Sequence, residues 1–207
     1  MMKNDVRIDM DKLHPLLKHK LKKFLKSCVS AGIGVIITEG YRSKEYQDQL
    51  YAKGRTAPGK VVTNARGNSY SSQHQWGIAF DIAINDKAHL YDEKMIAKAA
   101  AIAKKKGLKW GGDWKSFKDM PHFYLGKWGS GTTELKIKYG TPDKFMNEWT
   151  AKVKREKGLR LFKNTLKEKV LRKIPYNTKV NVLYKKLWYA KVEYMGTVGF
   201  VRKKYLG

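Results

Sequence analysis

Apolar side chains recur at helical spacing near the start of the chain. Between Asp9 and about Ser30 they return every three or four positions, while lysines occupy the opposite face. This period is typical of an amphipathic helix that buries one side. Residues 32–38 are then short, apolar and bounded by glycine, which predicts a buried strand. The chain therefore begins with a helix followed by a strand.

Polar and turn-forming residues follow that strand. Residues 39–43 predict a turn into a second helix, which we expect to run to about Leu50. Residues 54–77 are rich in Gly, Ser, Asn and Pro and predict a long loop. Long loops within a compact domain often carry function, so this segment is a first place to look for a site.

Beyond the loop, helix and strand patterns alternate again. Residues 78–84 predict a strand, and residues 93–106 predict an alanine-rich helix ended by Gly107. A turn-dense stretch with two tryptophans follows at residues 108–114. Helices mixed with short strands indicate an α+β domain over residues 1–140, built on a small antiparallel sheet.

The pattern changes after residue 140. Residues 141–156 are expected to form a linker or helix, and residues 157–207 read as all-β. The latter contain short β-prone runs separated by turns, at residues 180–184, 188–194 and 199–201. We therefore predict a second, small all-β domain at the end of the chain.

Charge is the strongest bias in the composition. The 207 residues carry a formal net charge of +26, of which residues 157–207 contribute +12. Such a field attracts polyanions, either nucleic acid or the anionic polymers of a bacterial cell wall. The basic residues are scattered and none of the common nucleic-acid motifs is found, so we expect no nucleic-acid partner. A basic nucleic-acid-binding protein remains the alternative from a different class of function.

Other features exclude several classes of protein. The single cysteine, Cys28, excludes an internal disulfide framework and a thiolate zinc site. No apolar run approaches the roughly 20 residues that span a bilayer, so no membrane insertion is expected. The N-terminal residues lack an apolar stretch after their charges, and we expect no secretory signal.

The segment from Ser72 to Asp81 holds the most informative chemistry. His74 and Asp81 stand seven residues apart, and Gly77 between them permits a tight change of direction. His122 supplies a second imidazole. Two histidines and one aspartate suit a catalytic zinc ion with an open fourth position. Asp119 could then act as general base on water, which is the arrangement of a metallohydrolase.

Each of these residues taken alone has an ordinary interpretation, as a surface histidine, a turn former or a core histidine. The neighbours of Asp81 change that balance, because residues 78–84 are otherwise apolar. An unpaired carboxylate buried there would cost several kcal/mol, and a metal partner removes that cost.

These motifs resemble a known family. The pattern S-x-H-x-x-G-x-A-x-D at residues 72–81, followed by D-x-P-H at residues 119–122, resembles the zinc L-alanyl-D-glutamate endopeptidases of bacteriophage endolysins. These are similar in turn to the D,D-carboxypeptidases of vancomycin resistance. The likeness covers most of residues 30–125, with further matching segments at 38–43, 50–51, 54–56, 58–59, 62–65 and 107–114.

The resemblance implies an enzyme that cuts the L-Ala–D-Glu bond of the peptidoglycan stem peptide and causes lysis of the host cell. A carboxypeptidase acting on D-Ala-D-Ala stays as the alternative enzyme, since the motifs fit both. The implied site has one zinc ion bound by His74, Asp81 and His122, Asp119 as catalytic base, Arg42 facing the substrate and its developing oxyanion, and substrate contacts from Gln47 and Ser72.

The end of the chain resembles a second family. Residues 173–183, 188–192 and 196–201 resemble a bacterial SH3-like domain that binds cell walls. The resemblance implies a small barrel that tethers the enzyme to peptidoglycan or anionic wall polymers, which raises its concentration near the substrate. We further expect a monomer that stays in the host cytoplasm until another phage protein opens the membrane.

Overall fold

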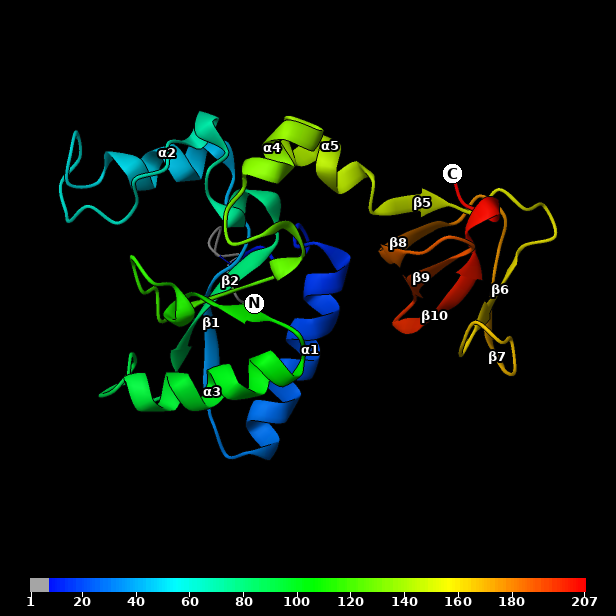
Figure 1. Ribbon diagram of the computed structural model, residues 1–207, viewed down its shortest axis with the longest axis horizontal. Helices are drawn as coiled ribbons and strands as arrows, with labels where there is room; N and C mark the ends of the chain where they lie inside the picture. The colour runs from blue at the N-terminus through cyan, green and yellow to red at the C-terminus, as the bar shows by residue number, and fades with distance from the viewer. Residues whose placement is uncertain (1–7) are drawn as a thin grey trace, which may run out of the picture. The chain divides into compact units, whose positions relative to one another are not determined.

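The computed structural model describes residues 8–207, which divide into two compact units (Figure 1). The first contains the residues up to Leu13 together with Leu17–Pro142, and the second contains His14–Leu16 together with Asp143–Gly207. The second unit thus includes residues 143–156, which were predicted to form a linker or helix before a domain starting at residue 157. The boundaries of the two domains remain a prediction. Residues 1–7, from which we expected no secretory signal, lie outside the described residues.

The first unit is built on an antiparallel sheet, as predicted. Its strand order is β1-β2-β4-β3, and every neighbouring pair is antiparallel. Strands β1 and β2 confirm the strands predicted at residues 32–38 and 78–84. The strands are β1 (Val35–Glu39), β2 (Ala79–Ile84), β3 (Lys109–Trp110) and β4 (His122–Tyr124).

Helices surround this sheet, which makes the unit a mixed α and β structure. Figure 1 shows α2 and α3 at opposite ends of the sheet, with α1 beside it. Within the part of the chain that the structure describes, no helix has the length and apolar character needed to cross a bilayer. The α-helices of the first unit are α1 (Pro15–Ser30), α2 (Lys44–Ala52), α3 (Glu93–Lys105) and α4 (Thr133–Tyr139). Its short 3₁₀ helices lie at Gly67–Ser69 (η2), Gln73–Trp76 (η3), Gly111–Asp113 (η4) and Gly126–Trp128 (η5). Apart from Pro142, α5 (Pro142–Asn147) belongs to the second unit, as does η6 (Lys203–Tyr205).

Local sequence explains where these helices begin. The hydroxyl of Ser43 accepts a hydrogen bond from the backbone N–H of Tyr46, and the carboxylate of Asp92 accepts one from that of Met95. Both caps satisfy N–H groups that the first helical turn leaves without partners. Helix α1 starts at Pro15 rather than at the predicted Asp9, because proline suits the first helical position, where its missing N–H costs nothing.

Aromatic packing joins α1 to the sheet. The ring of Phe24 lies 5.9 Å from that of Phe80 and 5.7 Å from that of Phe123, measured between centroids. Phe80 and Phe123 stand directly opposite each other on β2 and β4, so their side chains share one face of the sheet. That face forms the core of the unit.

The opposite face carries polar groups. Successive side chains of a strand alternate between faces, so Asp81 points away from the core that holds Phe80. Asp81 pairs in register with His122 on one side and with Glu39 on the other. The register of β1 shifts between Ile37 and Glu39, and such bulges redirect a side chain at the end of a strand. One face of the sheet therefore builds the core, and the other presents carboxylates and an imidazole.

The second unit is a curved antiparallel sheet of order β5-β8-β9-β10-β6-β7 (Figure 1). Strands β8, β9 and β10 confirm the runs predicted as β-prone, whereas β5 lies in the range predicted as linker or helix. The predicted SH3-like barrel is not confirmed, because among the described residues β5 and β7 do not pair to close the sheet. The strands are β5 (Thr150–Lys152), β6 (Leu159–Phe162), β7 (Val170–Ile174), β8 (Lys179–Lys185), β9 (Tyr189–Tyr194) and β10 (Thr197–Arg202).

We predict that Phe24→Ala lowers the free energy of unfolding of the first unit by about 3–5 kcal/mol, since it leaves a cavity between α1 and the sheet. Val29→Ala is the matched control, because Val29 lies on the same helix and is 77% exposed. Urea unfolding followed by tryptophan fluorescence measures both. Equal stability of the two variants would contradict the core described above.

Candidate metal centre

The chain turns sharply between the first two predicted ligands. His74 lies in η3, which ends at Gly77, and Gly77 has a left-handed φ of 63°. Its N–H donates to the carbonyl oxygen of His74 at 3.1 Å. Strand β2 starts two residues later, at Ala79, and carries Asp81. The predicted role of Gly77 in changing the chain direction is confirmed.

Side chains of His74, Asp81 and His122 converge. Nε2 of His74 lies 3.2 Å from Nδ1 of His122, and Oδ1 of Asp81 lies 3.3 Å and 3.0 Å from these two nitrogens. Four ligands at about 2.0–2.1 Å around a tetrahedral zinc ion stand about 3.3 Å apart. The three atoms thus have nearly the mutual spacing that a zinc ion requires.

The protein fixes the protonation of His74. Its Nδ1 lies 2.7 Å from the carbonyl oxygen of Gly40. A carbonyl oxygen only accepts, so Nδ1 carries the hydrogen and Nε2 keeps a lone pair toward the site. Burial, helped by the Arg42 guanidinium and opposed by Asp81, lowers the pKa of His74 to about 4. The imidazole is therefore neutral near pH 7, which is the form that binds metals.

Asp81 completes the donor set as a carboxylate. Burial alone would raise its pKa, but its interactions with His74 and His122 outweigh burial and hold the pKa well below the usual range. An ionised carboxylate facing the lone pair of His74 is an arrangement that a cation stabilises. Among the described residues, His74, Asp81 and His122 form the group whose ligand atoms could hold one metal ion, and their chemistry fits zinc.

Asp119 lies beside this group without belonging to it. It lines the same cavity, which has a volume of about 700 Å³. Burial raises its pKa, and this effect is opposed by His122 and Arg42 and supported by the nearby charge of Asp81. Its backbone N–H donates to Gly111 in η4, and a Cβ at Gly111 would come within 2.5 Å of the Asp119 carbonyl oxygen. A glycine at position 111 thus lets the segment that bears Asp119 pack closely.

Arg42 also reaches the cavity. Its Nη2 lies 3.6 Å from Oδ2 of Asp81, and its Nε lies 3.6 Å from Oε1 of Glu39. Glu39 in turn accepts a hydrogen bond from the hydroxyl of Tyr46. The guanidinium is thus held over the outer oxygen of Asp81, while the inner oxygen faces the two histidines.

The two predicted substrate contacts differ in position. Ser72 lines the cavity, whereas Gln47 is fully buried and is absent from the lining residues described. The Gln47 amide donates to Thr63 Oγ1 at 3.1 Å and to the carbonyl oxygen of Ala65 at 2.9 Å, and it accepts from Arg42 at 3.5 Å. A direct substrate contact from Gln47 stays a prediction, and its observed partners are groups of the protein.

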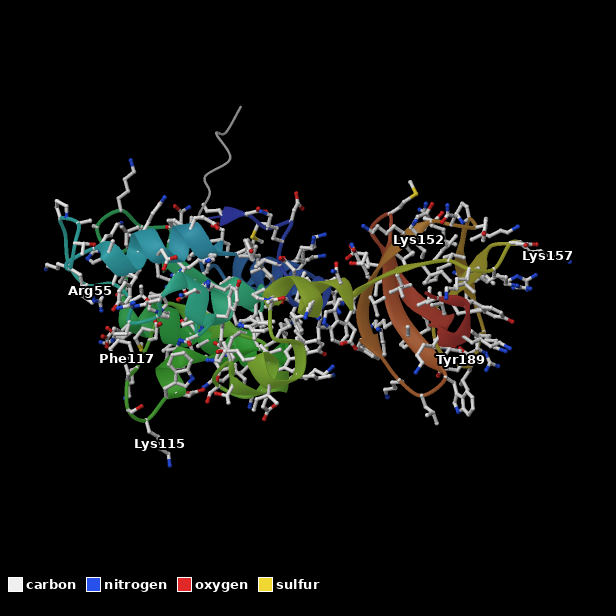
Figure 2. The ribbon with its side chains drawn as sticks, turned by 90° about the horizontal axis from the view of Figure 1, so that it is seen from above. Arg55, Lys115, Phe117, Lys152, Lys157 and Tyr189 are labelled. Carbon is white, nitrogen blue, oxygen red and sulfur yellow. The ribbon has the colours of Figure 1, made fainter. Side chains whose placement is uncertain are left out.

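Several residues at the site were not predicted. Gln73 accepts from Nε2 of His122, and Glu39 faces Arg42. The ring of Trp114 lies 5.2 Å from that of His122. Phe117 is exposed yet lines the cavity, and Figure 2 shows it on a loop at the same end of the unit as Arg55. In the sequence, the one indication of a role for Gln73 is that this polar residue immediately precedes the predicted ligand His74.

Comparison with known proteins finds peptidases that resemble this chain. Residues 65–125 match the profile of a peptidase family described as D-alanyl-D-alanine carboxypeptidase. The chain is 42% identical over 124 residues to the peptidoglycan L-alanyl-D-glutamate endopeptidase CwlK of Bacillus subtilis, a match that covers 55% of this chain and 73% of the relative. It is also 30% identical over 132 residues to an L-alanyl-D-glutamate peptidase of a Listeria phage, covering 60% of this chain and 42% of that protein.

A solved structure is similar at lower identity. The L-Ala D-Glu endopeptidase ChiX of Serratia marcescens matches with a TM-score of 0.43 and 24% identity, over 56% of this chain and 83% of that chain.

Three residues that could hold a metal ion, beside a half-buried carboxylate, together with these sequence matches define a metallopeptidase. The chain belongs to peptidase family M15, whose members depend on zinc.

We predict that His74→Ala abolishes stoichiometric zinc binding, because it removes one of three protein ligands. His89→Ala is the control, since His89 is an exposed histidine paired with Asp86. Elemental analysis after dialysis against zinc measures both variants. Zinc bound by His74→Ala at the level of the control would contradict the assigned ligands.

Proposed function

We propose that the protein is a peptidoglycan hydrolase that cleaves the L-Ala–D-Glu bond of the stem peptide with one zinc ion. The observation that carries this proposal is the convergence of Nε2 of His74, Oδ1 of Asp81 and Nδ1 of His122 within 3.0–3.3 Å of one another. The relatives named as L-alanyl-D-glutamate peptidases support the choice of bond.

The residues around the triad suggest how the reaction proceeds. When bound, zinc supplies Lewis-acid activation of water and of the scissile carbonyl. Asp119 then takes the proton of the attacking water and passes it to the leaving amine of D-Glu. A carboxylate whose pKa is raised by burial suits this task, because it accepts a proton more readily than an exposed one.

Arg42 is proposed to stabilise the negative charge that develops on the carbonyl oxygen. Its guanidinium is held by Glu39 and Asp81, and a donor fixed before the reaction loses little energy in reorganising. Ser72 lines the cavity and is the proposed contact for the peptide backbone. Gln47 supports Arg42 and the segment around Thr63 in addition to its predicted substrate role.

Removal of a terminal D-Ala is the second candidate reaction. The description of the matched family, a D-alanyl-D-alanine carboxypeptidase, favours it. The same triad, base and arginine serve either reaction, because both break a peptide bond next to a D-residue. The products distinguish them: new amino groups of D-Glu support the endopeptidase, and released D-Ala supports the carboxypeptidase.

For the second unit we propose an SH3-like, wall-binding role. It is strongly basic, and Trp188 is 68% exposed at the edge of a cavity of about 330 Å³ that Tyr184 and Phe200 also line. Exposed aromatic side chains around a cavity are typical of ligand sites. With peptidoglycan or anionic wall polymers as its ligand, this unit would hold a monomeric endolysin at the wall after its release from the host cytoplasm.

We predict that Asp119→Ala retains zinc but hydrolyses purified cell wall about 10²–10⁴-fold more slowly, because the proton acceptor is lost. Asp113→Ala is the control, since Asp113 is exposed and paired with Lys104. Activity is measured as the appearance of new amino groups, with end-group analysis to identify them. Normal hydrolysis by Asp119→Ala would refute the base, and D-Ala as the sole product would refute the bond.

We predict that Trp188→Ala weakens co-sedimentation with insoluble wall while cleavage of a short soluble stem peptide is unchanged. Val170→Ala, another exposed apolar position in the same unit, is expected to sediment normally. Unaltered sedimentation of Trp188→Ala would argue against this cavity as the wall contact. Wall binding replaced by DNA binding at physiological salt would favour the nucleic-acid alternative.

A further inference from the structure

Gln73 contacts His122, one of the proposed metal ligands, on the ring nitrogen that faces away from the other two ligands. It is 5% exposed, and its Oε1 lies 2.8 Å from Nε2 of His122. The other end of the same amide, Nε2, is buried and has no acceptor among the described residues. A buried NH₂ group without a partner is destabilising. The amide oxygen is thus directed at His122 although the NH₂ group gains nothing from that orientation.

The orientation of this amide decides which nitrogen of His122 carries the hydrogen. An amide oxygen only accepts, so with Oε1 toward the ring the hydrogen sits on Nε2 and Nδ1 keeps its lone pair. Nδ1 is the atom that lies 3.0 Å from Asp81 and 3.2 Å from His74. If the amide turned over, its NH₂ group would donate to Nε2. The hydrogen would then sit on Nδ1 and occupy the space that a metal ion needs.

The two histidines differ in this respect. The partner of His74 is the backbone carbonyl of Gly40, which cannot become a donor. The partner of His122 is a side-chain amide, which offers an acceptor at one end and a donor at the other. Only the second ligand therefore depends on a side chain for its tautomer.

We propose that Gln73 is a positioning residue that sets the tautomer of His122 and, through it, the affinity of the site for zinc. With the amide oxygen toward the ring, three electron pairs meet at the site. With the NH₂ group toward the ring, an N–H of His122 points at Asp81 and the metal has two ligands. Zinc binds one of the two arrangements and so shifts the population toward it.

This role rests on the proposed metal centre but not on which peptide bond is cut, so it is tested by metal binding without substrate. Gln73→Met removes the acceptor while keeping the length of the side chain. Loss of a partner behind a ligating histidine typically weakens metal binding about 10–100-fold, and we expect a loss of that size. Gln73→Glu keeps an acceptor oxygen, and we expect zinc affinity at or above that of the unsubstituted protein. Competition with a chromogenic chelator at fixed pH measures each value.

Gln75→Met is the matched control. Gln75 lies in the same 3₁₀ helix, is 1% exposed and donates its amide to the carbonyl oxygen of Gly67 at 2.7 Å. This substitution disturbs the packing of the segment as Gln73→Met does, but it removes no partner of a metal ligand. We expect its zinc affinity to be unchanged. Thermal unfolding of the metal-free variants verifies that all of them fold.

Long-range ¹H–¹⁵N spectra of the metal-free proteins supply a second readout. We expect His122 to be protonated at Nε2 in the unsubstituted protein and in Gln73→Glu. Wild-type zinc affinity in Gln73→Met would overturn the role of Gln73. An equal loss in Gln75→Met would also overturn it, because looser packing would then be the cause. Release of a product other than D-Glu amino ends would refute the proposed function and leave this role intact.

Discussion

The structure depends on the meeting of three electron-pair donors at one point of an antiparallel sheet. Asp81 and His122 stand opposite each other on β2 and β4, so the pleat places both on the face that points away from the core. His74 reaches the same point from the turn before β2. With both histidines presenting lone pairs, these donors repel one another unless a cation lies between them. The registration of two short strands therefore builds a group of side chains that could hold a metal ion.

The core and the site share the same strands, which couples their stability. Phe80 precedes Asp81 and Phe123 follows His122, and both rings pack on Phe24 of α1. A slip of one residue between β2 and β4 would bring the phenylalanines to the site and the ligands to the core. The aromatic packing on one face thus fixes the geometry of the candidate metal site on the other.

Part of this arrangement could be predicted from the sequence, because residues 32–38 and 78–84 have clear apolar patterns and Gly77 marks the turn. Strands β3 and β4 are only two and three residues long and were not predicted. The sequence also predicted that the first part of the chain mixes helices with strands and that residues 157–207 are rich in strands. The start of α1 was placed too early, since the apolar period does not distinguish helix from the residues that precede Pro15. Strand β5 was missed because it is short and gains its stability from pairing with β8, which local pattern does not reveal.

Long-range contacts account for what the sequence could not supply at the site. Gln73 and Glu39 acquire their roles only when the turn, β1 and β4 come together, and neither has a spacing that points to a ligand. Gln47 is the opposite case: it was predicted to contact the substrate, but its side chain is buried and bonds to Arg42, Thr63 and Ala65. Polar residues that support a site cannot be separated by local pattern from those that touch its substrate.

The hydrogen bond between His74 and the carbonyl of Gly40 has an evolutionary consequence. A backbone acceptor survives any substitution that preserves the fold, so the tautomer of His74 is protected against mutation. The side chain behind His122 is encoded by a single codon and can change. A substitution at position 73 could therefore change the zinc affinity of a related enzyme without changing any of the three ligands.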